Sequence, residues 1–106
     1  MYAIRSLDEL LESREQLRVS DHALREAHKE GLRAREIIHA IFHGRMVERY
    51  PERQRMLVAG PPWHDEPQVP IHVVCDYSDR DEIVAVTVYI PNRPRWLNDL
   101  VRGYAC

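Results

Sequence analysis

The hydrophobic period of the chain changes at Gly44, and this change limits the fold more than any other feature. Before Gly44, apolar residues recur every three or four positions, which is the spacing of amphipathic helices. After it, apolar and polar residues alternate, which is typical of half-buried strands. Helices first and strands afterwards favour an α+β fold, in which the helices pack on one face of the sheet.

Three helices are predicted before Gly44, over about 6–18, 20–31 and 34–43. Ser6 and Ser20 can cap the first two, since a serine oxygen accepts a hydrogen bond from a free backbone N–H of the first turn. Gly31 ends the second helix, and Leu32 can make the apolar contact that often follows such an end. The predicted buried stripe of the third helix is made of Ile37, Ile38, Ile41 and Phe42.

Four strands are predicted after Gly44, over about 45–50, 54–59, 71–77 and 82–90. Short turns between neighbours favour antiparallel pairing. The expected fold is therefore a roughly four-stranded antiparallel sheet with the N-terminal helices on one face. Simple alternation along the last strand predicts a core face made of Val84, Val86, Val88 and Ile90.

The opposite, open face of this sheet is expected to carry polar side chains. If the apolar residues of the third strand face the helices, His72 and Asp76 share the open face with Thr87 and Tyr89. Glu48 shares a face with Tyr50 in the first strand, by the same alternation. This set has the ingredients of a catalytic cleft, and it also has the composition of an ordinary solvated face.

The charge of the chain is nearly balanced. At 106 residues it is expected to form one domain, and its net charge of −2 means that nucleic acid would have to bind a local patch. All its basic residues except Lys29 are arginine, which suits phosphate but also reflects a GC-rich genome. Cys75 and Cys106 provide no disulfide framework, and no apolar run reaches about 18 residues. These features favour a cytoplasmic protein.

The second helix carries a polar stripe near its start. His22, Arg25 and Lys29 follow at offsets of three and four, so they share one side of the helix. RNA cleavage needs a base for the 2′-hydroxyl, a cation for the charge on phosphorus and an acid for the leaving oxygen. Arg25 and Arg55 can hold a phosphate through two parallel hydrogen bonds, and His22 or His72 can be base or acid. The alternative is a solvated helix surface.

Two other groups of ring residues have plainer explanations. His39 and His43 lie one helical turn apart, a spacing that suits two metal ligands, but no His-Glu-x-x-His motif is present. An exposed surface is the preferred interpretation, and no metal or other cofactor is expected. Trp63 and Trp96 can stack on bases, although packing within loops explains them as well.

Several short motifs occur in a fixed order over about residues 19–97. They are Ser20-Asp21-His22-Ala23, Arg25, Gly31-Leu32, Gly44, Tyr50-Pro51, Ile71-His72-Val73-Val74, Thr87-Val88-Tyr89 and Trp96. In this order and spacing the chain resembles a family of small bacterial proteins, the domain of unknown function 4258. One departure is Lys29-Glu30, where the family commonly has an arginine just before the glycine.

The resemblance implies a RelE/barnase-like fold and a toxin ribonuclease. Such a protein cleaves RNA, with mRNA the expected substrate, without a metal, and is held in check by a cognate antitoxin, in many cases a zinc-finger protein. His22, Arg25, His72 and Tyr89 match positions of the pattern and are the catalytic candidates. The residues expected to contact RNA are Lys29, Arg53, Arg55 and Glu48.

Other interpretations remain open at this point. The chain can be a non-catalytic module of the same fold that binds a protein or RNA. The helix at 6–18 lies outside the family-like segment and is a candidate surface for a partner, and association into a homodimer is a further option. A metal-dependent hydrolase using His39, His43 or His64 is the most remote alternative.

Overall fold

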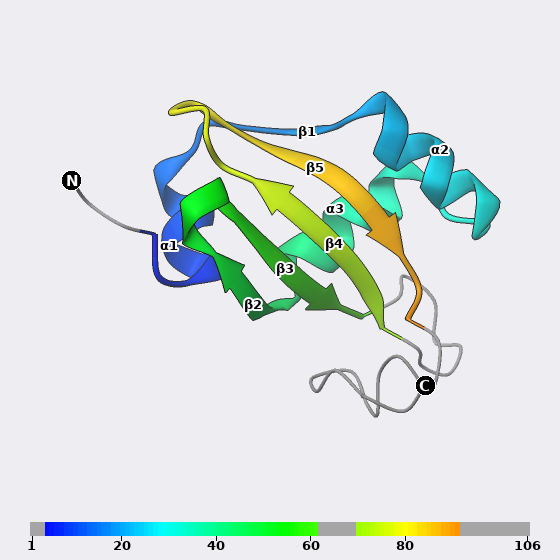
Figure 1. Cartoon of the computed structure of the whole chain (residues 1–106). Coiled ribbons are helices and arrows are strands. Elements are labelled where there is room, and N and C mark those ends of the chain that lie inside the picture. Colours follow the sequence, from blue (N-terminus) through cyan, green and yellow to red (C-terminus); the bar gives the residue numbers. More distant parts are fainter. Residues whose placement is uncertain (1–3, 62–69, 92–106) are drawn as a thin grey trace.

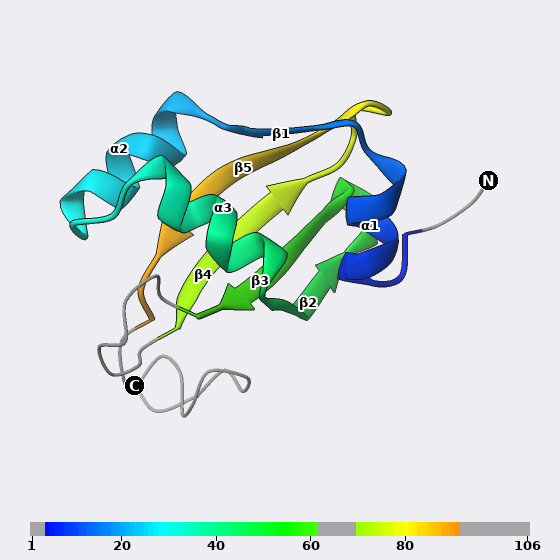
Figure 2. The same cartoon turned by 180° about the vertical axis from the view of Figure 1, so that it is seen from behind.

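Five strands form one sheet, and three helices pack against one of its faces in the computed structural model, which describes residues 4–61 and 70–91 (Figure 1). Seen from behind, α3 crosses the sheet and α1 lies beside it at the end near β2 (Figure 2). The helices are α1 (Leu7–Ser13), α2 (Asp21–Lys29) and α3 (Ala34–Phe42). The strands are β1 (Gln16–Val19), β2 (Arg45–Tyr50), β3 (Arg55–Gly60), β4 (Ile71–Asp76) and β5 (Glu82–Tyr89).

The helix ends follow the local signals of the sequence. The Ser6 hydroxyl accepts a hydrogen bond from Glu9 N at 3.1 Å, and the Ser20 hydroxyl accepts one from Ala23 N at 3.0 Å. Gly31 ends α2 with a φ of 76°, a backbone conformation that glycine adopts without steric cost. Both predicted caps and the predicted helix end are therefore confirmed.

The first predicted helix is too long. It ends at Ser13, and Gln16–Val19 forms strand β1 instead, which pairs in parallel with β5. Leu17 fits a helical spacing from Leu10, but Leu17 and Val19 also alternate toward the core, where both are partly buried. The free edge of β5 provides hydrogen-bond partners for the extended chain, and pairing at that edge decides between the two patterns.

The sheet is mixed rather than four-stranded and antiparallel. Its strand order is β1-β5-β4-β3-β2, and the three pairs other than β1–β5 are antiparallel. The four strands predicted after Gly44 are all present. The fifth strand comes from the part of the chain that was predicted to be helical.

A bulge in β5 changes which of its residues face the core. Val74 pairs with Thr87 but Cys75 pairs with Ala85, so Val86 is an extra residue in β5. The alternation therefore shifts by one residue at Val86. The expected core positions Val84 and Val86 are wrong, because both are only partly buried. Val88 is buried as predicted, Ile90 is partly buried against the core, and the other core residues of β5 are Ile83 and Ala85.

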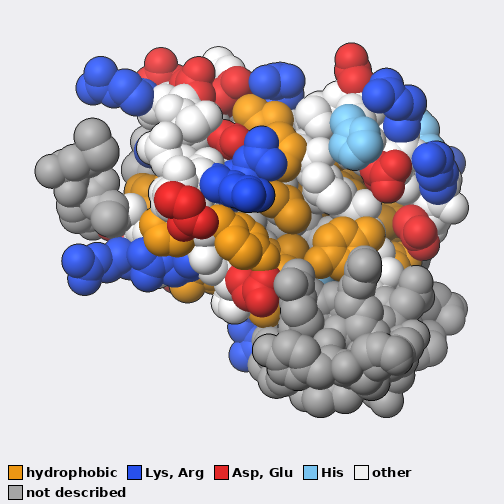
Figure 3. Space-filling view, in the orientation of Figure 1, with side chains coloured by type: hydrophobic (Ala, Val, Ile, Leu, Met, Phe, Trp, Pro, Cys, Tyr) orange, Lys and Arg blue, Asp and Glu red, His pale blue; other side chains and the backbone are white. Residues whose placement is uncertain are grey.

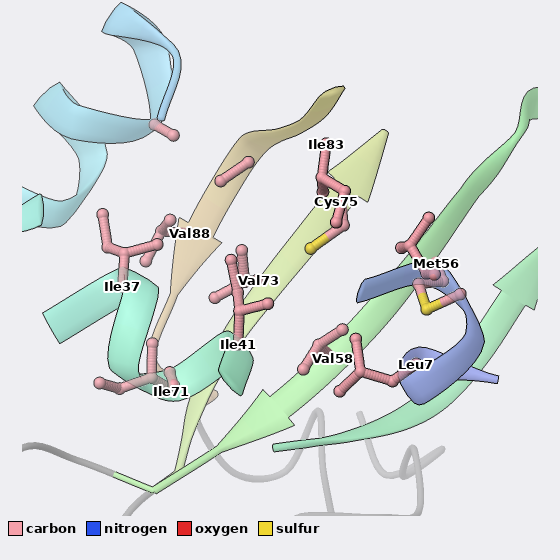
Figure 4. Close-up of a cluster of buried hydrophobic side chains, with 14 of the residues drawn as sticks. Leu7, Ile37, Ile41, Met56, Val58, Ile71, Val73, Cys75, Ile83 and Val88 are labelled. Carbon is pink, nitrogen blue, oxygen red and sulfur yellow. The ribbon is translucent and has the colours of Figure 1, made fainter. Parts of the chain in front are cut away.

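The core lies between α3 and the sheet, where side chains from α3, β3, β4 and β5 point toward one another (Figure 4). Ile37, Ala40 and Ile41 form the buried side of α3. Phe42 was predicted to be buried with them but is 55% exposed, because it lies about 100° around the helix from Ile41. Ala40 allows α3 to approach β3 so closely that a Cβ on Gly60 would collide with the Ala40 backbone.

Cys75 lies in this core, as expected for its strand position. It is fully buried, and burial raises the pKa of its thiol to about 12. Cys106, Trp63, His64 and Trp96 lie outside the described residues. No helix in the described part of the chain is long and apolar enough to cross a membrane.

Candidate active site on the open sheet face

The sheet face opposite the helices, which we call the open face, carries half of the predicted site residues. Strand pairing and alternation define it, since its residues pair with one another and alternate with core residues. Apolar side chains cross this face between charged groups (Figure 3). Its members on β2 to β5 are Arg45, Glu48, Tyr50, Arg55, Leu57, Ala59, His72, Val74, Asp76, Glu82, Val84, Thr87 and Tyr89.

His72 and Tyr89 form a pair on the open face. They lie directly opposite each other on β4 and β5, with His72 Nδ1 and Tyr89 Oη 3.4 Å apart. Their ring centroids are 5.3 Å apart and the rings are tilted by 58°. This is a long hydrogen bond, with the donor set by the tautomer of His72, and proton transfer along it would require the two groups to move closer together.

The two members of this pair differ in their access to solvent. His72 has a relative exposure of 0%, whereas Tyr89 is only partly buried. A buried polar ring on a strand flanked by Ile71 and Val73 is costly unless its nitrogens are hydrogen-bonded. The arrangement suits a histidine that acts through Tyr89, because only the tyrosine reaches the surface.

A second polar group lies at the other end of the open face. The Tyr50 hydroxyl donates to Glu48 Oε1, and Arg55 Nε donates to Asp76 Oδ2 at 2.8 Å. Tyr50, Arg55 and Asp76 lie opposite one another and form a row over three strands, and Glu48 lies beside this row, two residues before Tyr50 on β2. Asp76 lies four positions after His72 on β4, or about 13 Å along the strand. The two polar groups are therefore separate.

The carboxylate of Asp76 is tightly held. Partial burial would raise its pKa, but hydrogen bonds from Ser78 and the ion pair with Arg55 outweigh this effect, and the pKa is lowered. Ser78 donates both its backbone N–H, at 2.9 Å, and its hydroxyl, at 2.7 Å. The ionised form of Asp76 therefore stabilises the turn after β4.

We expect this carboxylate to make folding stability depend on pH. The pKa of Asp76 is lower in the folded state than in the unfolded state, where it is about 3.9. The contribution of Asp76 to the free energy of unfolding is therefore fully present above the unfolded pKa, and it is lost as pH falls through the folded pKa. Asp76→Asn should lower the free energy of unfolding at pH 7 by about 1 kcal/mol or less, since the ion pair is partly exposed. Urea unfolding at several pH values measures this difference.

The difference between wild type and Asp76→Asn should shrink in acid, because the wild-type carboxyl is then protonated. Glu52→Gln is the matched control, since Glu52 is an exposed carboxylate in the Pro51–Arg53 turn. A constant difference at every pH would show that Asp76 acts through packing rather than charge.

Helix α2 begins at the edge of β5 close to the open face. Ser20 N donates to Ala85 O at 3.0 Å, so the first turn of α2 lies beside the segment of β5 that leads to Tyr89. His22 and Arg25 are exposed on this helix. Figure 3 shows histidine, lysine and arginine side chains over α2 in the view of the open face.

The predicted site residues lie on three parts of the structure, namely the β4–β5 pair, helix α2 and the far end of the open face. His72 and Tyr89 are in contact on the sheet, while His22 and Arg25 are exposed on α2. Lys29 lies 3.5 Å from Glu26 in an exposed ion pair. The remaining candidates for RNA contact belong to the polar group at the far end or to its turn, and they are Glu48, Arg55 and the exposed Arg53.

Two partners in this region were not predicted as site residues. Tyr50 holds Glu48, and Asp76 pairs with Arg55. The spacing of two between Glu48 and Tyr50 was a visible signal, because residues at i and i+2 share a strand face. The pairing of Arg55 with Asp76 depends on the register of β3 and β4, which the sequence pattern leaves undetermined.

Comparison with known proteins gives one match. The sequence model of a family described as a domain of unknown function, DUF4258, matches residues 19–90, which include both the His72–Tyr89 pair and α2. No curated protein and no solved structure gives a significant match. Since the matched segment is well over half of the chain, the protein belongs to the DUF4258 family.

Proposed function

We propose that this protein is a metal-independent endoribonuclease with its active site on the open face. The observation that carries this proposal is the 3.4 Å contact between His72 and Tyr89 on the sheet face opposite helices α1 to α3. A tyrosine with access to solvent and a buried imidazole behind it are suited to transfer a proton to or from a substrate. The RelE/barnase-like fold suggested by the sequence motifs is part of the same proposal.

The proposed reaction needs only acid–base groups and a cation. A base takes the proton of the 2′-hydroxyl, whose oxygen attacks phosphorus and forms a cyclic phosphate. The 5′-oxygen leaves with a proton from the acid. Tyr89 exchanges one of these two protons with the RNA, and His72 in turn exchanges a proton with Tyr89. His22 exchanges the other proton with the RNA. Arg25 stabilises the charge that develops on the phosphate oxygens.

The polar group at the far end of the open face is proposed to hold RNA beyond the scissile bond. Arg55 shares its charge with Asp76, so it suits a flanking phosphate better than the reacting one. Glu48 can accept hydrogen bonds from a base or a ribose. Arg53 in the adjoining turn and Lys29 on α2 provide further cationic contacts to phosphates along the RNA.

The biological role proposed is that of a toxin in a toxin–antitoxin pair. The substrate would be mRNA in the cytoplasm, and the inhibitor a cognate antitoxin, in many such pairs a zinc-finger protein. An open sheet face with apolar side chains between charged groups supports this proposal, since an inhibitor seated there would cover Tyr89 (Figure 3).

The test is cleavage of labelled RNA by purified protein in excess chelator. We expect cleavage by wild type, strong loss of cleavage in His22→Gln, and no cleavage at a position where the RNA carries a 2′-deoxyribose. His28→Gln is the matched control, because His28 is an exposed histidine of the same helix. A wild-type protein that leaves RNA intact under all these conditions would contradict the proposal.

A non-catalytic binding module is the second candidate. Two observations favour it: the net charge of −2, and the placement of His22 and Arg25 on a different element from His72. Gel-shift experiments on the intact protein separate the candidates. RNA binding without cleavage, in wild type, would favour the module over the enzyme.

A further inference from the structure

A second histidine pair lies on α3, away from the open face. His39 and His43 are one helical turn apart, and their ring centroids are 4.4 Å apart. When two imidazoles bind one ion through nitrogens at about 2.1 Å, each ring centre lies about 3.2 Å from the ion. At the tetrahedral angle of about 109°, the two ring centres are then about 5.2 Å apart, a little more than in this structure. Small side-chain rotations therefore suffice for both rings to share one ion.

An exposed phenylalanine accompanies this pair. Phe42 lies between the two histidines in sequence. Among the described residues it is the one large apolar side chain that is exposed, at 55%. His39 is partly buried and His43 is exposed, so all three rings reach the outer surface of α3. An aromatic side chain in this position gains free energy when a second surface covers it.

The described residues of one chain supply two ligands here, His39 and His43. Among residues 4–61 and 70–91 there is no group of three or more His, Cys, Asp or Glu side chains that could hold an ion. Structural zinc is almost always bound by four protein ligands. A two-fold contact between identical surfaces doubles the ligand number from two to four, because each copy presents the same residues to the other.

We propose that His39 and His43 bind a divalent first-row transition ion such as Zn²⁺ in a site that a second copy of the chain completes. The same two histidines of the second copy provide the remaining ligands, and Phe42 of each copy packs in the contact. Since α3 covers the face of the sheet opposite the open face, the contact leaves Tyr89 accessible. This inference does not depend on the proposed ribonuclease activity.

The experiment is sedimentation of tag-free protein with chelator and with added Zn²⁺, together with calorimetric titration of Zn²⁺. We expect monomers in chelator, dimers in Zn²⁺, and one ion for every two chains. His39→Gln and His43→Gln should each lower Zn²⁺ affinity by at least about 10-fold. Replacing a residue that only hydrogen-bonds to a metal ligand already costs about this much, and these substitutions remove the ligand itself. His28→Gln should bind Zn²⁺ like wild type.

Phe42→Ser tests the contact separately from the ligands, and it should weaken dimerisation in Zn²⁺ while circular dichroism shows a folded chain. Absence of Zn²⁺ binding would overturn the proposal. So would a one-to-one complex with a monomer, or a dimer that persists after both histidine substitutions. An unchanged dimerisation constant in Phe42→Ser would also overturn it, since the contact would then lie elsewhere.

Discussion

Tyr89→Phe is expected to lower the rate of RNA cleavage by about 10²–10⁴-fold, the usual contribution of a positioned acid or base. The substitution removes only the hydroxyl that lies 3.4 Å from His72 Nδ1 and leaves the ring in place. Its effect on the free energy of unfolding should stay near 1 kcal/mol, the net value of one hydrogen bond. Single-turnover cleavage of a short RNA and urea unfolding measure the two effects.

The matched control for this variant is Tyr77→Phe, which removes a hydroxyl from a buried tyrosine of the core and should leave the cleavage rate unchanged. His72→Gln should lose as much activity as Tyr89→Phe, and the double variant should lose little more. Groups that act as a unit show such non-additive losses. Losses that multiply in the double variant would show that His72 and Tyr89 act independently.

Gly60→Ala is expected to lower the free energy of unfolding by about 3 kcal/mol, near the top of the usual range for overpacking. The added Cβ would meet the carbonyl oxygen and other backbone atoms of Ala40. Backbone atoms of a helix cannot rotate away as a flexible side chain can, so α3 would have to move off β3. Urea denaturation followed by circular dichroism measures the loss.

Gly31→Ala provides a comparison for the same chemical change in open space. No atom lies within 4 Å of a Cβ built on Gly31, whose φ is 76°. Its expected cost is about 1 kcal/mol, from the left-handed backbone alone. If Gly60→Ala lowered the free energy of unfolding by no more than Gly31→Ala does, this would contradict the close approach of α3 to β3.

Local signals in the sequence predicted most of the secondary structure. Ser6, Ser20 and Gly31 act through hydrogen bonds and backbone preferences within a few residues, so their effects can be read from short segments. Strand β1 could not be predicted in this way. The pattern of Leu17 and Val19 fits a helix or a strand, and the choice depends on pairing with a segment that lies far away in the sequence.

The candidate site was predicted in part for a similar reason. Alternation placed His72 and Tyr89 on one face, and the structure pairs them directly. The same rule failed for Val84 and Val86, because it assumes an uninterrupted strand and the extra residue at the bulge shifts the alternation. Where α2 lies relative to the open face depends on the packing of Ala23 and Ala27 into the core, which no short pattern specifies.

The parallel pairing of β1 with β5 has a consequence for synthesis on the ribosome. Residue 16 meets residue 82, so the first strand of the sheet is made long before the strand that it joins. Loop closure over such a span slows folding and leaves early segments open to wrong partners. During synthesis, β1 therefore remains without its sheet partner until β5 has emerged from the exit tunnel.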